Sequence, residues 1–351
     1  MIDHALALAP NAPEAHLALG LFFYWGHREY DNALTEFNRT LELQPNNALA
    51  QQYCAWVHRR RGEWERALAA AQRAEQLDPR DASIPGNIGS TYLALRLWKD
   101  AEQAVLRAFA IDPHSTLAAA FLLYTRLTET GDVESARRAF DGFPEDVKSR
   151  LISQPGQRGQ GGSGDIARII GVPVYLDVIE RHFPDAFQAF EKQTVNNDRE
   201  HLEQLAGRVM LRVLAGQTDA AKSMGEEARP LLEARLRGQP DDTFTMTALS
   251  WVYLALGRNA DALRVSRQAA DLIPVEKDAL TGPSFQNGLA QIEARAGASD
   301  EAIKRLRHLL SIPADDVSIA RLKIDPVWDP IRSRPGFQQL LSGPEQIGPV
   351  K

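Results

Sequence analysis

The chain has 351 residues, of which 44% are hydrophobic and 25% charged, and its formal net charge is −6. That apolar content excludes a disordered chain, and no segment reaches the roughly 18–20 consecutive apolar residues of a membrane-spanning helix. The single cysteine excludes an internal disulfide and every multi-cysteine metal centre, and the acidic balance disfavours a nucleic-acid binder, which must neutralise phosphates.

The first ten residues, MIDHALALAP, have the pattern of the end of a helix followed by its closing proline. No partner helix precedes them, so we expect the chain to start in the middle of a repeat. Two interpretations follow: a partner covers this half-hairpin, or the chain is the repeat portion of a longer protein.

Residues 11–114 repeat with a period of 34. Two series show it: Ala33, Ala67 and Ala101, and Pro45, Pro79 and Pro113. Within each unit, apolar residues recur at three- and four-residue steps, which predicts two amphipathic helices per unit. The first unit has one extra residue between Gly20 and Ala33, so we expect its hairpin turn to be distorted.

This pattern resembles the tetratricopeptide repeat, a helical hairpin of 34 residues. Leu19–Gly20 and Ile88–Gly89 match the leucine–glycine site of that family on its first helix, whereas the second unit has Cys54–Ala55 there. The resemblance implies an all-α, right-handed α-solenoid of tetratricopeptide-type hairpins with a C-terminal cap. The first helix of each hairpin would line the concave side.

The pattern weakens after residue 115 and returns at 249–313, with two irregular hairpins predicted at 166–193 and 198–239. Pro230 should kink or interrupt the last helix before the repeats resume. Residues 155–164, PGQRGQGGSG, formally contain GxGxxG, but no convincing strand precedes it and no lysine follows, so a flexible linker is the better interpretation. The expected organisation is an N-terminal array (1–143), a linker (144–165), C-terminal hairpins (166–313), and a cap with a tail (314–351).

Residues 309–341 are not a repeat unit. They resemble a terminal phrase that follows such arrays in bacterial signalling proteins, where the arrays join serine/threonine kinase, nucleotide cyclase or winged-helix modules. Trp328, Ile331, Phe337, Leu340 and Leu341 should seal the last hairpin. None of the kinase signature motifs is present in the sequence.

No constellation for catalysis, metal binding or cofactor binding emerges, so we expect neither an enzyme nor a cofactor. The acidic pairs Asp241–Asp242 and Asp315–Asp316 follow prolines and are interpreted as helix N-caps. Cys54 is expected in the core. The basic run 58–61 (HRRR) is either a solvated helix end or a contact for an anion.

Candidate partner-binding residues follow from the expected concave face. They are Tyr24, Trp25, Gln52, Trp56, Arg59, Arg60, Asn87, Ser90 and Tyr124. Trp, Tyr and Arg dominate binding hot spots, although the tryptophans could instead pack between neighbouring repeats. Some members of the family clamp a carboxyl terminus with lysine and asparagine; Gln52 and Trp56 stand in those places, which favours an apolar or arginine-assisted ligand.

The sequence therefore predicts a non-catalytic scaffold or sensor module that binds a protein or peptide segment and acts in bacterial signal transduction. The alternatives are a self-association module that forms a homo-oligomer and, with less support, an enzyme whose site lies in the irregular middle. We expect no nucleic-acid partner and no membrane insertion. A cytoplasmic location is expected, with the periplasmic part of a membrane-anchored protein as the alternative.

Overall fold

The computed structural model describes residues 11–153, 166–343 and 345, and this part of the chain is built from helices without strands. The expected half-hairpin at 1–10 and the glycine-rich segment 155–164 lie outside the described residues.

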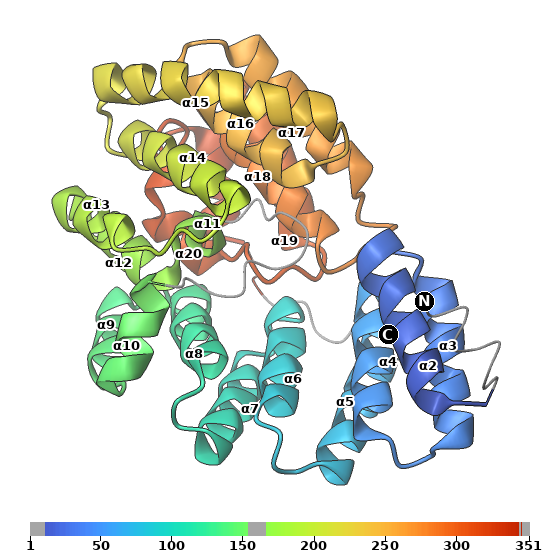
Figure 1. Cartoon of the computed structure of the whole chain (residues 1–351). Coiled ribbons are helices and arrows are strands. Elements are labelled where there is room, and N and C mark those ends of the chain that lie inside the picture. The colour runs from blue at the N-terminus through green and yellow to red at the C-terminus, as the bar shows by residue number, and fades with distance from the viewer. Residues whose placement is uncertain (1–10, 154–165, 344, 346–351) are drawn as a thin grey trace.

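Eight helical hairpins follow one another round an arc in the described residues (Figure 1). The first four are α2 (Pro13–Leu21) extended by η1 (Phe22–His27) with α3 (Tyr30–Leu43), α4 (Ala48–Arg60) with α5 (Trp64–Leu77), α6 (Ser83–Ala94) with α7 (Trp98–Ile111), and α8 (Thr116–Glu129) with α9 (Val133–Asp141). After α10 (Glu145–Ser153) and α11 (Ile166–Ile170) come α12 (Val172–Ile179) with α13 (Phe183–Glu191), α14 (Asp198–Leu214) with α15 (Thr218–Gly238), α16 (Thr243–Ala255) with α17 (Asn259–Leu272), and α18 (Gly282–Arg295) with α19 (Ser299–Leu310). The chain continues through α20 (Ile319–Ile324), η2 (Pro326–Trp328) and α21 (Pro335–Leu341).

Small residues mark the places where the two helices of a hairpin cross. The repeated alanines Ala33, Ala67 and Ala101 are all buried. A Cβ atom added at Gly20 would lie 2.4 Å from the Phe37 ring, because α2 and α3 approach closely there. The all-α helical-repeat solenoid expected from the 34-residue period is therefore confirmed.

Replacing Gly20 with alanine should lower the free energy of unfolding by about 1–3 kcal/mol, because the buried Phe37 ring must move to admit a methyl group. Gly86 is a matched control, since it also lies buried in the first helix of a hairpin. A Cβ atom added there would lie 3.7 Å from its nearest neighbour, the Leu117 side chain. There alanine should stabilise the chain by up to about 1 kcal/mol through helix propensity. Urea unfolding of both variants measures the contrast. Equal effects would contradict the close-crossing interpretation.

The extra residue of the first unit is absorbed inside a helix. The last turn before the loop, Phe22–His27, is a π-helix, which holds one more residue per hydrogen-bonded turn than an α-helix. Arg28 then takes a left-handed conformation with φ of 53°, where the second hairpin has Gly62 with φ of 72°. The predicted distortion is present, and it turns the aromatic residues of this segment relative to a regular helix.

Two expectations for the middle of the chain need correction. Residues 145–153 were expected to belong to a linker, but they form α10, which packs against α8, α12 and α13. Pro230 was expected to kink or interrupt its helix, and the interruption does not occur, because α15 runs from Thr218 to Gly238 with the proline inside. Since α15 packs on α14 and on α16, tertiary contacts offset the hydrogen bond that the proline cannot donate.

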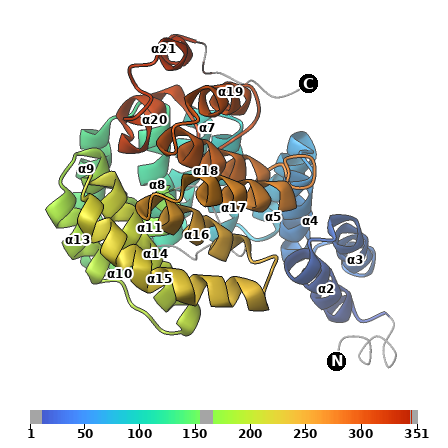
Figure 2. The same ribbon diagram turned by 90° about the horizontal axis from the view of Figure 1, so that it is seen from above.

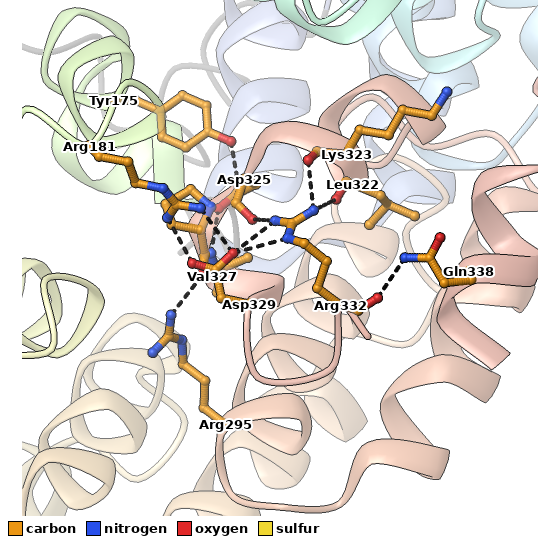
Figure 3. Close-up of polar contacts among 11 residues, drawn as sticks. Tyr175, Arg181, Arg295, Leu322, Lys323, Asp325, Val327, Asp329, Arg332 and Gln338 are labelled. Atoms are coloured by element: carbon orange, nitrogen blue, oxygen red, sulfur yellow. Dashed lines mark hydrogen bonds and ion pairs between the residues drawn. The ribbon is translucent and has the colours of Figure 1, made fainter. Parts of the chain in front are cut away.

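The C-terminal phrase forms a cap with a buried apolar interior. Trp328 and Phe337 pack with their ring centroids 6.3 Å apart, and both are buried together with Ile331 and Leu340. Arg332 ties the backbone of this cap together, as it donates to the carbonyl groups of Leu322, Lys323 and Asp325 (Figure 3). These hydrogen bonds satisfy backbone carbonyl groups at the C-terminal end of α20 that have no partner within the helix.

The ring of hairpins closes on itself. The segment that follows α17 returns to the N-terminal hairpins, where the Ala279 amide donates to the Arg60 carbonyl at 2.7 Å (Figure 1). The segment between α19 and α20 lies against α6, where the Ala314 amide donates to the Ala94 carbonyl at 3.0 Å. α20 also packs on α8. Seen from above, the hairpin α2–α3 lies at the edge of the molecule, away from α13 and α15 (Figure 2).

Candidate interaction site

The predicted partner-binding residues divide into two groups in the structure. Trp25 is exposed, and Trp56, Arg60 and Asn87 are partly exposed. The other five are buried: Tyr24, Gln52, Arg59, Ser90 and Tyr124. Much of the expected concave face is therefore covered. Part of the cover is packing between neighbouring N-terminal hairpins, as for Gln52 against Ser83, and part is the C-terminal half of the same chain, as for Tyr124 against Arg321.

α6 and α8 are covered by the segment around α20. The Arg96 guanidinium donates to the carbonyl groups of Leu309, Leu310 and Val317 at 2.8–3.1 Å. On α8, the Tyr124 hydroxyl accepts from Arg321 at 2.6 Å, and the Arg321 guanidinium lies 5.0 Å from the centre of the Tyr124 ring. Arg321 also donates to the Tyr175 hydroxyl at 2.9 Å and so joins α8, α12 and α20.

The end of α4 is covered by the loop that follows α17. Arg60 forms an ion pair with the buried carboxylate of Asp278 at 3.0 Å, and the Tyr30 hydroxyl donates to the same carboxylate at 2.7 Å. Burial by itself would raise the pKa of Asp278, but Arg60 and the donated hydrogen bonds outweigh it and hold that pKa below its usual range. Arg59, which precedes Arg60 on α4, is buried against α6, and desolvation lowers the pKa of Arg59 to about 10.

An aromatic surface at the N-terminal end remains open. It consists of Trp25, which is 39% exposed, Trp56, and Leu49, which is 43% exposed. The Trp25 and Trp56 rings meet edge to face with centroids 5.9 Å apart. Leu49 lies two turns before Trp56 on the same face of α4. Below them, Tyr24 and Tyr53 pack against the Trp56 ring and hold it in place.

Cys54 lies in the core, as expected, with 3% of its surface exposed. Burial raises the pKa of its thiol to about 12, so the thiolate fraction at pH 8 is negligible. The native chain should therefore not react with Ellman's reagent within an hour at pH 8, and one thiol should react at once in guanidinium chloride. Rapid reaction of the native chain would show that the packing of α4 against α3 opens readily.

Several residues that join the two halves of the chain carry no sequence signal. Asp278 and Arg321 stand outside the repeated positions, and Arg96 occupies the left-handed turn position of Arg28 and Gly62, which gives no indication of its contacts with the C-terminal half. The acidic pair at 315–316 was interpreted as a helix N-cap, and this was wrong. Asp315 pairs with Arg168 and Asp316 accepts from Asn287, while Ser318 caps α20. Of the other pair, Asp242 does cap α16.

Two further properties of the described residues bear on the class of site. Among residues 11–153 and 166–343, no three histidine, cysteine, aspartate or glutamate side chains are grouped so that they could hold a metal ion. Across the same ranges, no helix combines the length and the apolar character that crossing a membrane requires.

The stacked hairpins define a helical-repeat solenoid. The family model of the anaphase-promoting complex, cyclosome, subunit 3 matches residues 26–108, the part with the regular 34-residue period. The matched residues are those that resemble the tetratricopeptide repeat in sequence.

Comparison with solved structures finds chains of similar fold. PilF of Pseudomonas aeruginosa is 20% identical, with a TM-score of 0.45 over 62% of this chain and 91% of that one. MamA is 21% identical, with a TM-score of 0.36 over 40% and 81%. YrrB, described as a TPR protein with an unusual peptide-binding site, is 14% identical, with a TM-score of 0.35 over 70% and 96%. A comparison with curated proteins finds no match.

Proposed function

We propose that the chain is a non-catalytic scaffold whose aromatic surface, Trp25, Leu49 and Trp56, binds a segment of another protein. The observation that carries the proposal is that Trp25 and Leu49 are exposed, and Trp56 partly exposed, at the N-terminal end of the expected concave face. Tryptophan gives a large contact area at little entropic cost, which is why it is frequent in binding hot spots.

The geometry favours an apolar or helical ligand. Leu49, which is exposed, and Trp56, which is partly exposed, are seven residues apart on α4, so they form a stripe along the helix axis. A partner helix with apolar residues at three- and four-residue steps would match such a stripe. Gln52, the polar side chain between them, is buried and donates to Ser83 at 3.1 Å, so it serves the packing of α4 on α6.

The terminal phrase at 309–341 supports a place in bacterial signal transduction, because it resembles the segment that follows such arrays in signalling proteins. In that setting the array would recruit a protein to a kinase, cyclase or regulator module. The proposal does not depend on which module is joined to the chain.

A capture experiment tests the surface. The double variant Trp25→Ala with Leu49→Ala should lose captured partners from the source cell by about tenfold or more, because two hot-spot side chains are removed. The matched control is Leu106→Ala with Leu231→Ala, which truncates two equally exposed leucines on α7 and α15. Equal capture by both variants would overturn the proposal.

Light scattering on the same variants examines self-association. A dimer that dissociates in Trp25→Ala with Leu49→Ala, but not in the control, would assign the aromatic surface to a second copy of the chain. A monomer at every concentration would remove the self-association alternative.

A further inference from the structure

The loop 274–281 is seated on the second hairpin through a fully satisfied carboxylate. Asp278 is 1% exposed and receives hydrogen bonds from Arg60 and from the Tyr30 hydroxyl. The backbone amides of Leu280 and Thr281 donate to the same side chain at 3.1 and 2.8 Å. The carboxylate thus fixes the conformation of its own loop and at the same time docks that loop on α3 and α4.

The residues after Asp278 are recognised as well. The Ala279 amide donates to the Arg60 carbonyl at 2.7 Å. Ala279 and Leu280 pack against an apolar cluster of Trp64, Ala94 and Leu95. A Cβ atom at Gly62 would lie 3.3 Å from that of Ala279, so glycine leaves the room that the loop needs. Thr281 completes the contact through its hydroxyl, which meets Arg60.

These contacts form a receptor with three parts. Arg60 and Tyr30 take a carboxylate, the Arg60 carbonyl takes the next backbone amide, and the apolar cluster takes the next two side chains. The receptor adjoins the aromatic surface, because Arg60 donates to the Tyr24 hydroxyl at 3.0 Å and the Tyr24 ring lies 4.7 Å from that of Trp25. A single protein segment could therefore reach both.

We propose that the loop 274–281 is an internal occupant of a receptor for acidic protein segments, and that a partner presenting an aspartate followed by small and apolar residues displaces it. This inference rests on the proposed function for the statement that the partner is a protein. Displacement releases a contact between residues 218 positions apart and leaves the hairpins α2–α5 joined to the ring through their stacking on α6.

Because the loop 274–281 belongs to the same chain, it occupies the receptor whenever no partner is bound. A loop attached to the same molecule competes at an effective concentration in the millimolar range. A free segment with the same contacts therefore binds weakly to the unaltered chain. A partner that also engages the aromatic surface gains a second contact and can compete.

A synthetic peptide tests the receptor directly. The probe is the fluorescein-labelled peptide PVEKDALTGP, which copies residues 274–283, titrated by fluorescence anisotropy into the full chain carrying Asp278→Ala. This variant should bind the peptide at least about tenfold more tightly than the unaltered chain, because its own loop has lost the carboxylate and competes less well. A peptide with asparagine in place of the aspartate should bind about tenfold more weakly. Equal binding of the two peptides, or no binding by the variant, would overturn the proposal.

A second measurement needs no variant. In hydrogen exchange on the unaltered chain, millimolar PVEKDALTGP should accelerate exchange of the Ala279 amide, because it leaves the Arg60 carbonyl when the loop is displaced. Unchanged protection of this amide would overturn the proposal even if Asp278→Ala failed to fold. Neither measurement involves the cellular partner, so loss of capture by the aromatic-surface variant and loss of peptide binding are separate outcomes.

Discussion

Replacing Phe337 with alanine is expected to lower the free energy of unfolding by about 3–5 kcal/mol, because a fully buried aromatic side chain is removed and leaves a cavity. Phe337 is 0% exposed and packs on Trp328 at the centre of the cap. The cap contacts both α18 and α19, so the cavity should weaken the last hairpin as well. Urea unfolding followed by circular dichroism measures the change.

Leu106→Ala is the control for this cap variant. Leu106 is 49% exposed on α7, and its truncation should change the free energy of unfolding by no more than about 0.5 kcal/mol. If Phe337→Ala were as mild as Leu106→Ala, the cap would not be part of the folded core.

Replacing Arg321 with methionine should cost about 3–5 kcal/mol, because one partner of a buried charged pair is removed while the other stays. Arg321 is buried, and its guanidinium lies 4.0 Å from the carboxylate of Asp325. It also donates to the hydroxyls of Tyr124 and Tyr175. Lysine should rescue little, since a single ammonium group cannot reproduce the planar fork.

The matched control is Arg39→Met, which removes an exposed arginine paired with Glu42. Exposed ion pairs contribute about 0–1 kcal/mol, so this variant should unfold close to the unaltered chain. Near-ultraviolet circular dichroism of the tyrosines adds a local readout for Arg321→Met. A tyrosine signal identical to that of the unaltered chain would contradict the joint described for α8, α12 and α20.

The parts of the fold that repeat could be predicted from the sequence. A helix buries residues that recur at a fixed spacing, so the burial of Ala67 and Ala101 could be predicted from the local sequence pattern alone. The aromatic residues Tyr30, Trp64 and Trp98 begin α3, α5 and α7 for the same reason. The extra residue before Ala33 was visible as a break in the count, although its form as a π-helix was not.

Closure of the ring was not predictable from such patterns. Asp278 lies between two repeats, and nothing in its surroundings indicates that its partner is Arg60. The run HRRR was interpreted either as a solvated helix end or as an anion contact, and Arg60 does bind an anion, one supplied by the same chain. The candidate binding face was derived from open solenoids, which explains why Tyr124 and Ser90 turned out to be buried.

Closure changes how the chain should fold. In an open repeat array each unit contacts only its neighbours, so folding propagates along one dimension and ends can be removed unit by unit. Here contacts such as that of Arg96 with Leu310 span 214 residues, and that of Arg321 with Tyr124 spans 197. Contacts between residues so far apart in the sequence slow folding, because a long loop must lose conformational entropy before the contact can stabilise it. The array should consequently unfold as a cooperative whole, and truncation at its C-terminal end should destabilise the hairpins at its N-terminal end.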